Sequence, residues 1–123
     1  MEHELIRLTR RFMLSRRDRL LPSCWLPPAD LYRTPDGWLL KLEMAGVAPD
    51  TIAVQVCGRS ITIRGERRDG LRIQGHTCYS MEIAYCAFKR TLELPIDLDR
   101  ATVNSEYDLG MLVVTITPEV RQP

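Results

Sequence analysis

The residues that could carry chemistry are two histidines, four cysteines and one pair of aspartates. They are His3, His76, Cys24, Cys57, Cys78, Cys86, Asp97 and Asp99. A nucleophilic site needs a Ser or Cys beside a His and a carboxylate, and only His76 falls inside the expected domain, within a polar loop. Asp97 and Asp99 occupy a connector, where aspartates form turns more readily than they act as an acid pair. No enzyme activity is expected.

No motif in the sequence predicts a metal site or a cofactor site. The chain has no C-x-x-C pair, no Gly-rich phosphate loop, no G-x-S-x-G, no H-E-x-x-H and no calcium loop. No secretory apolar segment precedes residue 25, so we expect reduced cysteines and a cytoplasmic protein. No apolar stretch approaches the length of about 18 residues that a membrane-spanning helix needs.

Chain length and net charge narrow the class of protein further. The chain has 123 residues, 45% of them hydrophobic and 27% charged, with a formal net charge of +1. These values suit one globular domain and predict no strong overall attraction to nucleic acid or to anionic membranes. The charge is unevenly placed, because six arginines lie within the first nineteen residues.

Alternating apolar residues between positions 38 and 65 predict the strands that would organise the domain. Residues 38–44, 51–57 and 60–65 each repeat an apolar side chain at every second position, as half-buried strands do. Gly58 and Arg59 separate the last two runs and predict a tight hairpin. We expect these runs to form a three-stranded antiparallel meander.

Further strands are expected at residues 30–33, 81–83, 88–94, 101–107 and 111–116. A chain of about seven to nine short strands with frequent turns and no internal helix predicts an all-β, antiparallel, immunoglobulin-like β-sandwich. Residues 66–80 are polar and too long for a hairpin, but Leu71 and Ile73 form a short strand-like island inside them.

Residues 1–21 form an arm that we expect to be helical or disordered. Leu5, Leu8 and Phe12 recur at helical spacing among the arginines. Such an arm could pack on its own domain or a neighbour, present apolar residues to partners, or bind a membrane surface or nucleic acid. Pro22, Pro27 and Pro28 then mark a linker.

Several sequence pieces occur in one unbroken order across residues 28–118. They include Asp30-Leu31-Tyr32-Arg33, Gly58-Arg59-Ser60-Ile61-Thr62-Ile63-Arg64-Gly65-Glu66-Arg67, Phe88-Lys89-Arg90 and Tyr107-Asp108-Leu109-Gly110-Met111-Leu112-Val113-Val114-Thr115-Ile116. This ordered set resembles the small heat shock proteins, the family built on the α-crystallin (Hsp20) domain. The resemblance implies an arm and linker at residues 1–27, an α-crystallin domain at 28–118 and a tail at 119–123.

The sequence departs from the family pattern at three places. Ser105 stands where the family motif has alanine, and Cys86 stands at a position that is commonly glycine. The family's tail usually carries an I-x-I or V-x-I motif that docks into a neighbouring subunit, whereas Val120 stands alone after the last strand here.

The resemblance implies an ATP-independent holdase that binds unfolding proteins and prevents their aggregation. The residues expected to contact clients or partners are Leu5, Ile6, Leu8, Phe12 and Met13 in the arm and Val54, Val56, Val103 and Ser105 in the tail-binding groove. The groove valines could equally be ordinary core residues.

The resemblance also implies a dimer. In similar bacterial and plant proteins the long loop adds a strand to the partner's sheet edge. By this analogy Leu71, Ile73 and Arg90 would lie at the dimer interface, and the dimers would associate further through the arm.

Two other functions fit the same sequence. One is a co-chaperone module of the p23-like β-sandwich type, which would dock on a chaperone instead of on unfolded clients. The other is a nucleic-acid-associated protein acting through the basic arm, whose affinity would fall steeply as salt rises.

Overall fold

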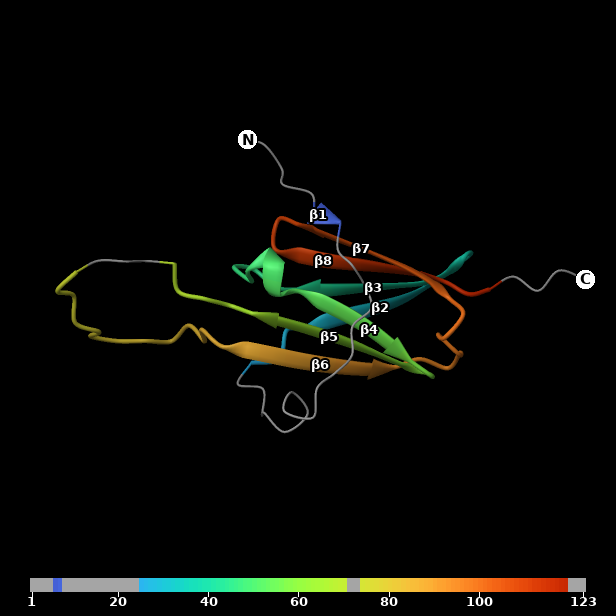
Figure 1. Cartoon of the computed structure of the whole chain (residues 1–123), viewed down its shortest axis with the longest axis horizontal. Helices are drawn as coiled ribbons and strands as arrows, with labels where there is room; N and C mark the ends of the chain where they lie inside the picture. Colours follow the sequence, from blue (N-terminus) through green and yellow to red (C-terminus); the bar gives the residue numbers. More distant parts are fainter. Residues whose placement is uncertain (1–5, 8–24, 71–73, 120–123) are drawn as a thin grey trace, which may run out of the picture.

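The structure is a computed structural model that describes residues 6–7, 25–70 and 74–119. Within these ranges the chain forms strands and a single turn of 3-10 helix (Figure 1). The elements are β1 (Ile6–Arg7), β2 (Ala29–Thr34), β3 (Gly37–Glu43), η1 (Pro49–Thr51), β4 (Ala53–Cys57), β5 (Ser60–Glu66), β6 (Ala87–Glu93), β7 (Thr102–Asp108) and β8 (Met111–Thr117). The expected all-β sandwich is confirmed.

The strands form two antiparallel sheets. The larger sheet has the order β1-β7-β8-β3-β2, and the smaller has the order β4-β5-β6. Tight turns join β2 to β3, β4 to β5 and β7 to β8. Gly58, whose φ of 59° suits glycine, lies in the β4–β5 turn as predicted. Gly110, with φ 76°, has the same role between β7 and β8, and an added Cβ there would lie 2.9 Å from Ala45 Cα.

The predicted three-stranded meander is wrong at its first pairing. β3 pairs with β2 and β8 in the larger sheet, whereas β4 pairs with β5 in the smaller one. The connection through η1 therefore crosses from one sheet to the other. Alternation shows which face of a strand is buried, but it does not specify the neighbouring strand.

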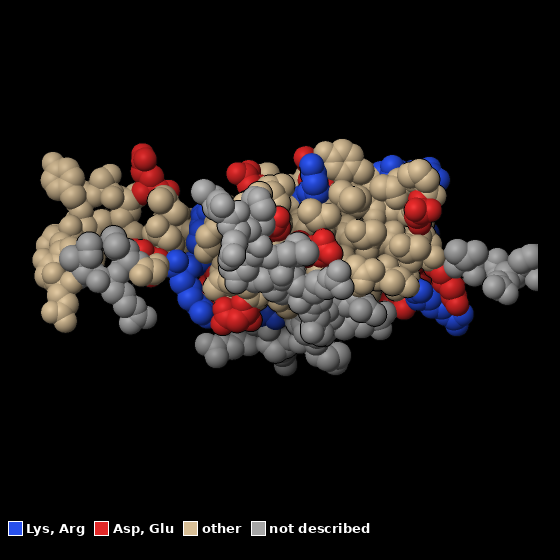
Figure 2. All heavy atoms as spheres, turned by 90° about the horizontal axis from the view of Figure 1, so that it is seen from above, with Lys and Arg blue, Asp and Glu red and all other residues tan. Residues whose placement is uncertain are grey.

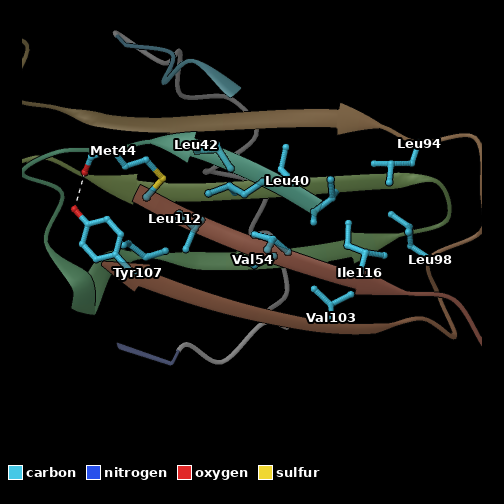
Figure 3. Close-up of a cluster of buried hydrophobic side chains, with 14 of the residues drawn as sticks. Leu40, Leu42, Met44, Val54, Leu94, Leu98, Val103, Tyr107, Leu112 and Ile116 are labelled. Atoms are coloured by element: carbon cyan, nitrogen blue, oxygen red, sulfur yellow. Dashed lines mark hydrogen bonds between the residues drawn. The ribbon is translucent and has the colours of Figure 1, made fainter. Parts of the chain in front are cut away.

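The core fills the space between the two sheets. Alternate side chains of the central strands are fully buried, among them Leu40, Leu42, Val54, Ile61, Ile63, Leu112, Val114 and Ile116. Figure 3 shows the labelled members of this cluster converging between the sheets. The pattern agrees with the period of two in the sequence.

The linker before β2 fixes how the sheets are aligned. The Arg90 guanidinium on β6 donates a hydrogen bond from Nη1 to the Pro27 carbonyl at 2.9 Å. The Trp25 ring meets the Phe88 ring edge-on, with 5.2 Å between centroids. β6 therefore lies on the β2 side of the sandwich, and β4, at the other edge of the smaller sheet, lies on the β7 side.

Two expected elements differ in the structure. Residues 81–83 alternate as a strand would, but they form none, and β6 begins only at Ala87. Ile6–Arg7 form the short strand β1 instead of a helical turn. β1 is extended because β7 offers it a pairing edge, whereas residues 81–83 pair with no described strand of this chain.

One buried hydrogen bond closes the end of the core near β1. The Tyr107 hydroxyl donates to the Met44 carbonyl oxygen at 2.6 Å, and Figure 3 marks this bond. Burial raises the pKa of the Tyr107 phenol, and a backbone hydrogen bond to Val47 opposes this rise. The phenol therefore stays protonated as the donor.

Tyr107→Phe should lower the free energy of unfolding at pH 7 by about 0.5–1.5 kcal/mol, because the buried Met44 carbonyl would lose its hydroxyl donor and keep only the Val47 N–H at 3.2 Å. A phenol whose pKa is raised by folding contributes stability below its unfolded pKa of about 10, and this contribution is lost as pH rises further. The difference between wild type and variant should shrink above about pH 10. Urea unfolding at both pH values measures it, and a constant difference would contradict this role for the hydroxyl.

Candidate client and subunit interfaces

An apolar stripe lies exposed on the connection between β5 and β6. Every second residue from Tyr79 to Tyr85 is a large apolar or aromatic side chain, and Met81 and Ile83 are 66% and 58% exposed. We call Tyr79, Met81, Ile83 and Tyr85 the loop stripe. In Figure 1 the described parts of this connection extend well beyond the ends of β5 and β6, and in Figure 2 they form the projection at the left.

The loop stripe has the spacing of a strand without a sheet to join. Its side chains share one face if the segment is extended, because the period of a strand is two. Leaving four large side chains in water forfeits about 1.5–3 kcal/mol for each. Such a patch on a protein surface is typical of an interaction site.

An open sheet edge lies elsewhere on the same chain. β2 pairs with β3 on one side, and no described strand pairs with its other side. Leu31 and Tyr32 on this strand are exposed. An unpaired row of backbone N–H and C=O groups is a template for an added strand.

Arg67 holds the two ends of the loop together. Its backbone N–H donates to the Cys86 carbonyl at 3.0 Å, and its Nε donates to the Ala84 carbonyl at 2.8 Å. Its guanidinium also lies 3.9 Å from the centroid of the Trp25 ring, a cation–π contact. One side chain thus connects the start of the loop, its end and the linker before β2.

The predicted dimer residues are only partly described. Leu71 and Ile73 lie outside the described residues. Arg90 is half-buried and binds the Pro27 carbonyl of its own chain, as given above. The structure therefore shows an intrachain role for Arg90, and its part in a dimer stays a prediction.

The four groove candidates lie on the two strands that the sequence indicated. Val54 on β4 and Val103 and Ser105 on β7 are buried, while Val56 is half-buried and packs against the core. The Ser105 hydroxyl is buried without a hydrogen-bond partner. The outer edges of β4 and β7 lie on the same side of the sandwich, and we use the name β4–β7 groove for the docking place that the resemblance predicts along them.

The arm pairs with the outer edge of β7 at one place. β1 pairs with β7 in antiparallel register, with Ile6 opposite Tyr107 and Arg7 opposite Glu106. Of the arm residues expected to contact clients, Ile6 is described by its backbone alone. Leu5, Leu8, Phe12 and Met13 lie outside the described residues.

The oxidation state and the burial of the cysteines differ from the expectation of reduced, packed thiols. Cys86 is disulfide-bonded, whereas Cys57 and Cys78 are free and exposed instead of packed as small apolar residues. The expectation of reduced thiols throughout is therefore wrong at Cys86. The chain has no closely spaced cysteines, so its sequence gave no sign of a pairing.

The described residues also bear on metal binding and on membrane crossing. Among them, no group of three or more His, Cys, Asp and Glu side chains is arranged to hold a metal ion. No helix in the same part of the chain has the length and apolar character to cross a bilayer. What the described surface does offer is sheet edges and exposed apolar side chains.

A sandwich with open edges and an exposed apolar loop defines a protein-interaction module, and comparison with known proteins identifies it. The model of the Hsp20/alpha crystallin family matches residues 30–123. The chain belongs to this family. Membership supports the chaperone-type interpretation of the sequence.

Individual small heat shock proteins are similar to this chain in sequence. The chain is 24% identical over 91 residues to small heat shock protein C2 of Rickettsia felis, covering 74% of this chain and 59% of that protein. It is 30% identical over 102 residues to a 17.7 kDa class II heat shock protein of Arabidopsis thaliana, covering 78% and 65%. The match thus spans about three fifths of the length of these relatives.

Solved structures of similar proteins have the same fold as this chain. A small heat-shock protein from Xylella fastidiosa is 26% identical, with a TM-score of 0.63 over 80% of this chain and 92% of that one. HspA from Xanthomonas axonopodis is also 26% identical, with a TM-score of 0.63 over 77% and 95%.

Two features of these interfaces go beyond what was predicted from the amino-acid sequence. Residues 81–83 were assigned to an ordinary strand, although the alternation from Tyr79 to Tyr85 was a signal for a longer apolar stripe. The contacts of Arg67 with Trp25 and the loop had no signal, because they join residues far apart in the sequence.

Proposed function

We propose that this protein is an ATP-independent holdase that binds exposed apolar segments of unfolding proteins. The observation that carries the proposal is the loop stripe: a member of the Hsp20 family exposes alternating large apolar side chains beside open sheet edges. Extended apolar segments of an unfolding client can add to such edges through backbone hydrogen bonds. We place this activity in the cytoplasm, a proposal that rests on the sequence alone.

Client contacts are proposed at two places. The arm residues Leu5, Ile6, Leu8, Phe12 and Met13 would present apolar side chains, and the β4–β7 groove with Val54, Val56, Val103 and Ser105 would accept an extended segment. The proposed division is an arm and linker at residues 1–27, an α-crystallin domain at 28–118 and a tail at 119–123.

The proposed assembly is a homodimer made by strand exchange. The loop of one copy would lie along the outer edge of β2 in the other, the strand on which Leu31 and Tyr32 are exposed. Because the contact is two-fold, each copy gives a loop and receives one, and the pairing closes at two subunits. Leu71, Ile73 and Arg90 would lie at or beside this interface, and the arm would carry weaker association between dimers.

Light scattering tests the holdase activity. Several client proteins of different size are heated to unfold with increasing amounts of this protein and without nucleotide. Scattering should fall in proportion to the added subunits, and ATP should not change the result. If a molar excess leaves the scattering of every client unchanged, the proposed function is wrong.

A further inference from the structure

Two cysteines in the connection between β5 and β6 are in different chemical states. Cys78 carries a free thiol and is exposed, whereas Cys86, eight positions further along the chain, is half-buried and disulfide-bonded. Because Cys57 and Cys78 are both free, the other half of this disulfide lies outside the described residues. A free thiol and a disulfide in one segment are the two reactants of thiol–disulfide exchange.

The segment between the two sulfur atoms leaves Cys78 free to approach Cys86. Residues 78–86 are all described and form neither helix nor strand, and every residue from Cys78 to Ile83 is exposed. The far end of the segment is fixed, since Arg67 binds the carbonyl oxygens of Ala84 and Cys86. A segment of this length without secondary structure closes into a ring within about 10–100 ns. The extended course of the connection in Figure 1 is therefore no barrier to an encounter.

The other free thiol, Cys57, is too far away to react with the same disulfide. Cys57 ends β4 at the first residue pair of β5, whereas Cys86 directly precedes β6 at the last residue pair of β5. β5 has seven residues, so its two ends lie about 20 Å apart. The hydrogen bonds of the small sheet fix both positions. Cys78 is thus the free thiol whose segment can move toward Cys86.

We propose that Cys78 is the nucleophile of an internal disulfide exchange. The Cys78 thiolate attacks the Cys86 Sγ atom, a bond forms between these two sulfur atoms, and the bond between Cys86 and its present partner breaks. The partner sulfur leaves as a thiolate and takes up the proton that Cys78 has lost. One disulfide and one thiol are present before and after the step, so it needs neither oxidant nor reductant.

The new bond would change the shape of the loop stripe. Fully extended, the eight steps from Cys78 to Cys86 span about 26 Å, whereas a disulfide holds its two Cα atoms about 4–7 Å apart. The ring form is therefore not a strand, and the four side chains of the loop stripe lose their common face. This consequence rests on the proposed dimer, because a closed ring does not fit along β2 of a partner subunit. Exchange would convert a dimer-forming subunit into a monomer.

Peptide mapping of the full chain tests the exchange independently of the dimer. Cleavage after Arg72 and Lys89 gives one peptide, residues 73–89, that contains both cysteines. The protein is kept in mildly alkaline buffer without oxidant, and samples are acidified, alkylated and digested. Before exchange this peptide carries an alkyl group on Cys78 and is joined through Cys86 to a second peptide. After exchange it carries no alkyl group and contains an internal disulfide.

The internally bonded peptide should increase at least about tenfold over its starting share within hours. Cys57→Ser, the matched control, should react at the wild-type rate, and this rate should not depend on protein concentration. Retention of the alkyl group on Cys78 throughout would overturn the proposal. A rate that rises with protein concentration would also overturn it, by showing that the attacking thiol comes from another copy.

Analytical ultracentrifugation of the same samples tests the effect on assembly. As exchange proceeds, the dimer dissociation constant should rise at least about a thousandfold for the exchanged subunits of wild type and Cys57→Ser. It should stay constant in Cys78→Ser, which has no nucleophile in the loop. If the internal disulfide accumulates and the dissociation constant stays the same, the proposed dimer is contradicted and the exchange stands.

Discussion

Replacing Met81 and Ile83 together by aspartate should convert the proposed dimer into a folded monomer. Both side chains are largely exposed within one chain, and each would be buried in both copies of a two-fold interface. Losing two apolar groups worth about 1.5–3 kcal/mol each, twice over, should raise the dimer dissociation constant at least about a thousandfold. Analytical ultracentrifugation over a range of concentrations measures this constant.

A matched control separates interface effects from general surface charge. Leu109 is 69% exposed at the β7–β8 turn, far in sequence from the loop stripe. Leu109→Asp should leave the dissociation constant unchanged. The strand-exchange model is contradicted if the Met81 and Ile83 double variant remains as stable a dimer as this control.

Arg67→Ala should lower the free energy of unfolding by about 3 kcal/mol. The change removes a charged hydrogen bond to the Ala84 carbonyl and the contact over the Trp25 ring, and each such interaction is worth about 1–3 kcal/mol. It also frees the linker and the end of the loop from each other, so residues 84–86 should exchange amide hydrogens faster. Urea unfolding and hydrogen exchange measure the two effects.

The neighbouring arginine is the natural comparison. Arg68 forms ion pairs with Glu66 at 3.0 Å and Asp50 at 3.7 Å, and its side chain is 54% exposed. Exposed pairs of this kind contribute little, because water and salt screen them. Arg68→Ala should therefore change neither unfolding nor loop exchange measurably. An equal effect of the two substitutions would show that Arg67 has no special connecting role.

The strands of the core were predictable because burial on one face leaves a period of two in the sequence. Val54, Ile61, Ile63 and Val114 follow that period, and all four are buried where it places them. The partner of a strand leaves no such trace. β3 was therefore assigned to the wrong neighbour, since its alternation fits pairing with β8 as well as with β4.

The loop stripe shows a second limit of the period-of-two pattern, which does not tell in which chain the pairing strand lies. Met81 and Ile83 alternate as strand residues do, but no described strand of this chain pairs with them. A pattern that predicts a strand records an extended segment with one apolar face, whether its sheet lies in the same chain or in another. In the proposed dimer, residues 81–83 would become a strand of the partner's sheet.

Contacts between distant segments could not be predicted at all. Arg67 and Trp25 meet because the linker folds back along β6, which depends on the arrangement of both sheets. The pairing of Ile6 with Tyr107 likewise joins the two ends of the chain. Helical spacing of Leu5, Leu8 and Phe12 predicts a helix over the arm, but at Ile6–Arg7 the edge of β7 outweighs this weak local preference.

Recovery of a heated client in soluble complexes tests the central claim most directly. A client is unfolded by heat with this protein and without nucleotide, and the mixture is separated by size-exclusion chromatography with light scattering. The holdase account predicts that the client leaves the pellet and elutes together with this protein, at a mass above that of either alone. Client that pellets as completely as it does with an inert protein of similar size, and never co-elutes, would contradict it.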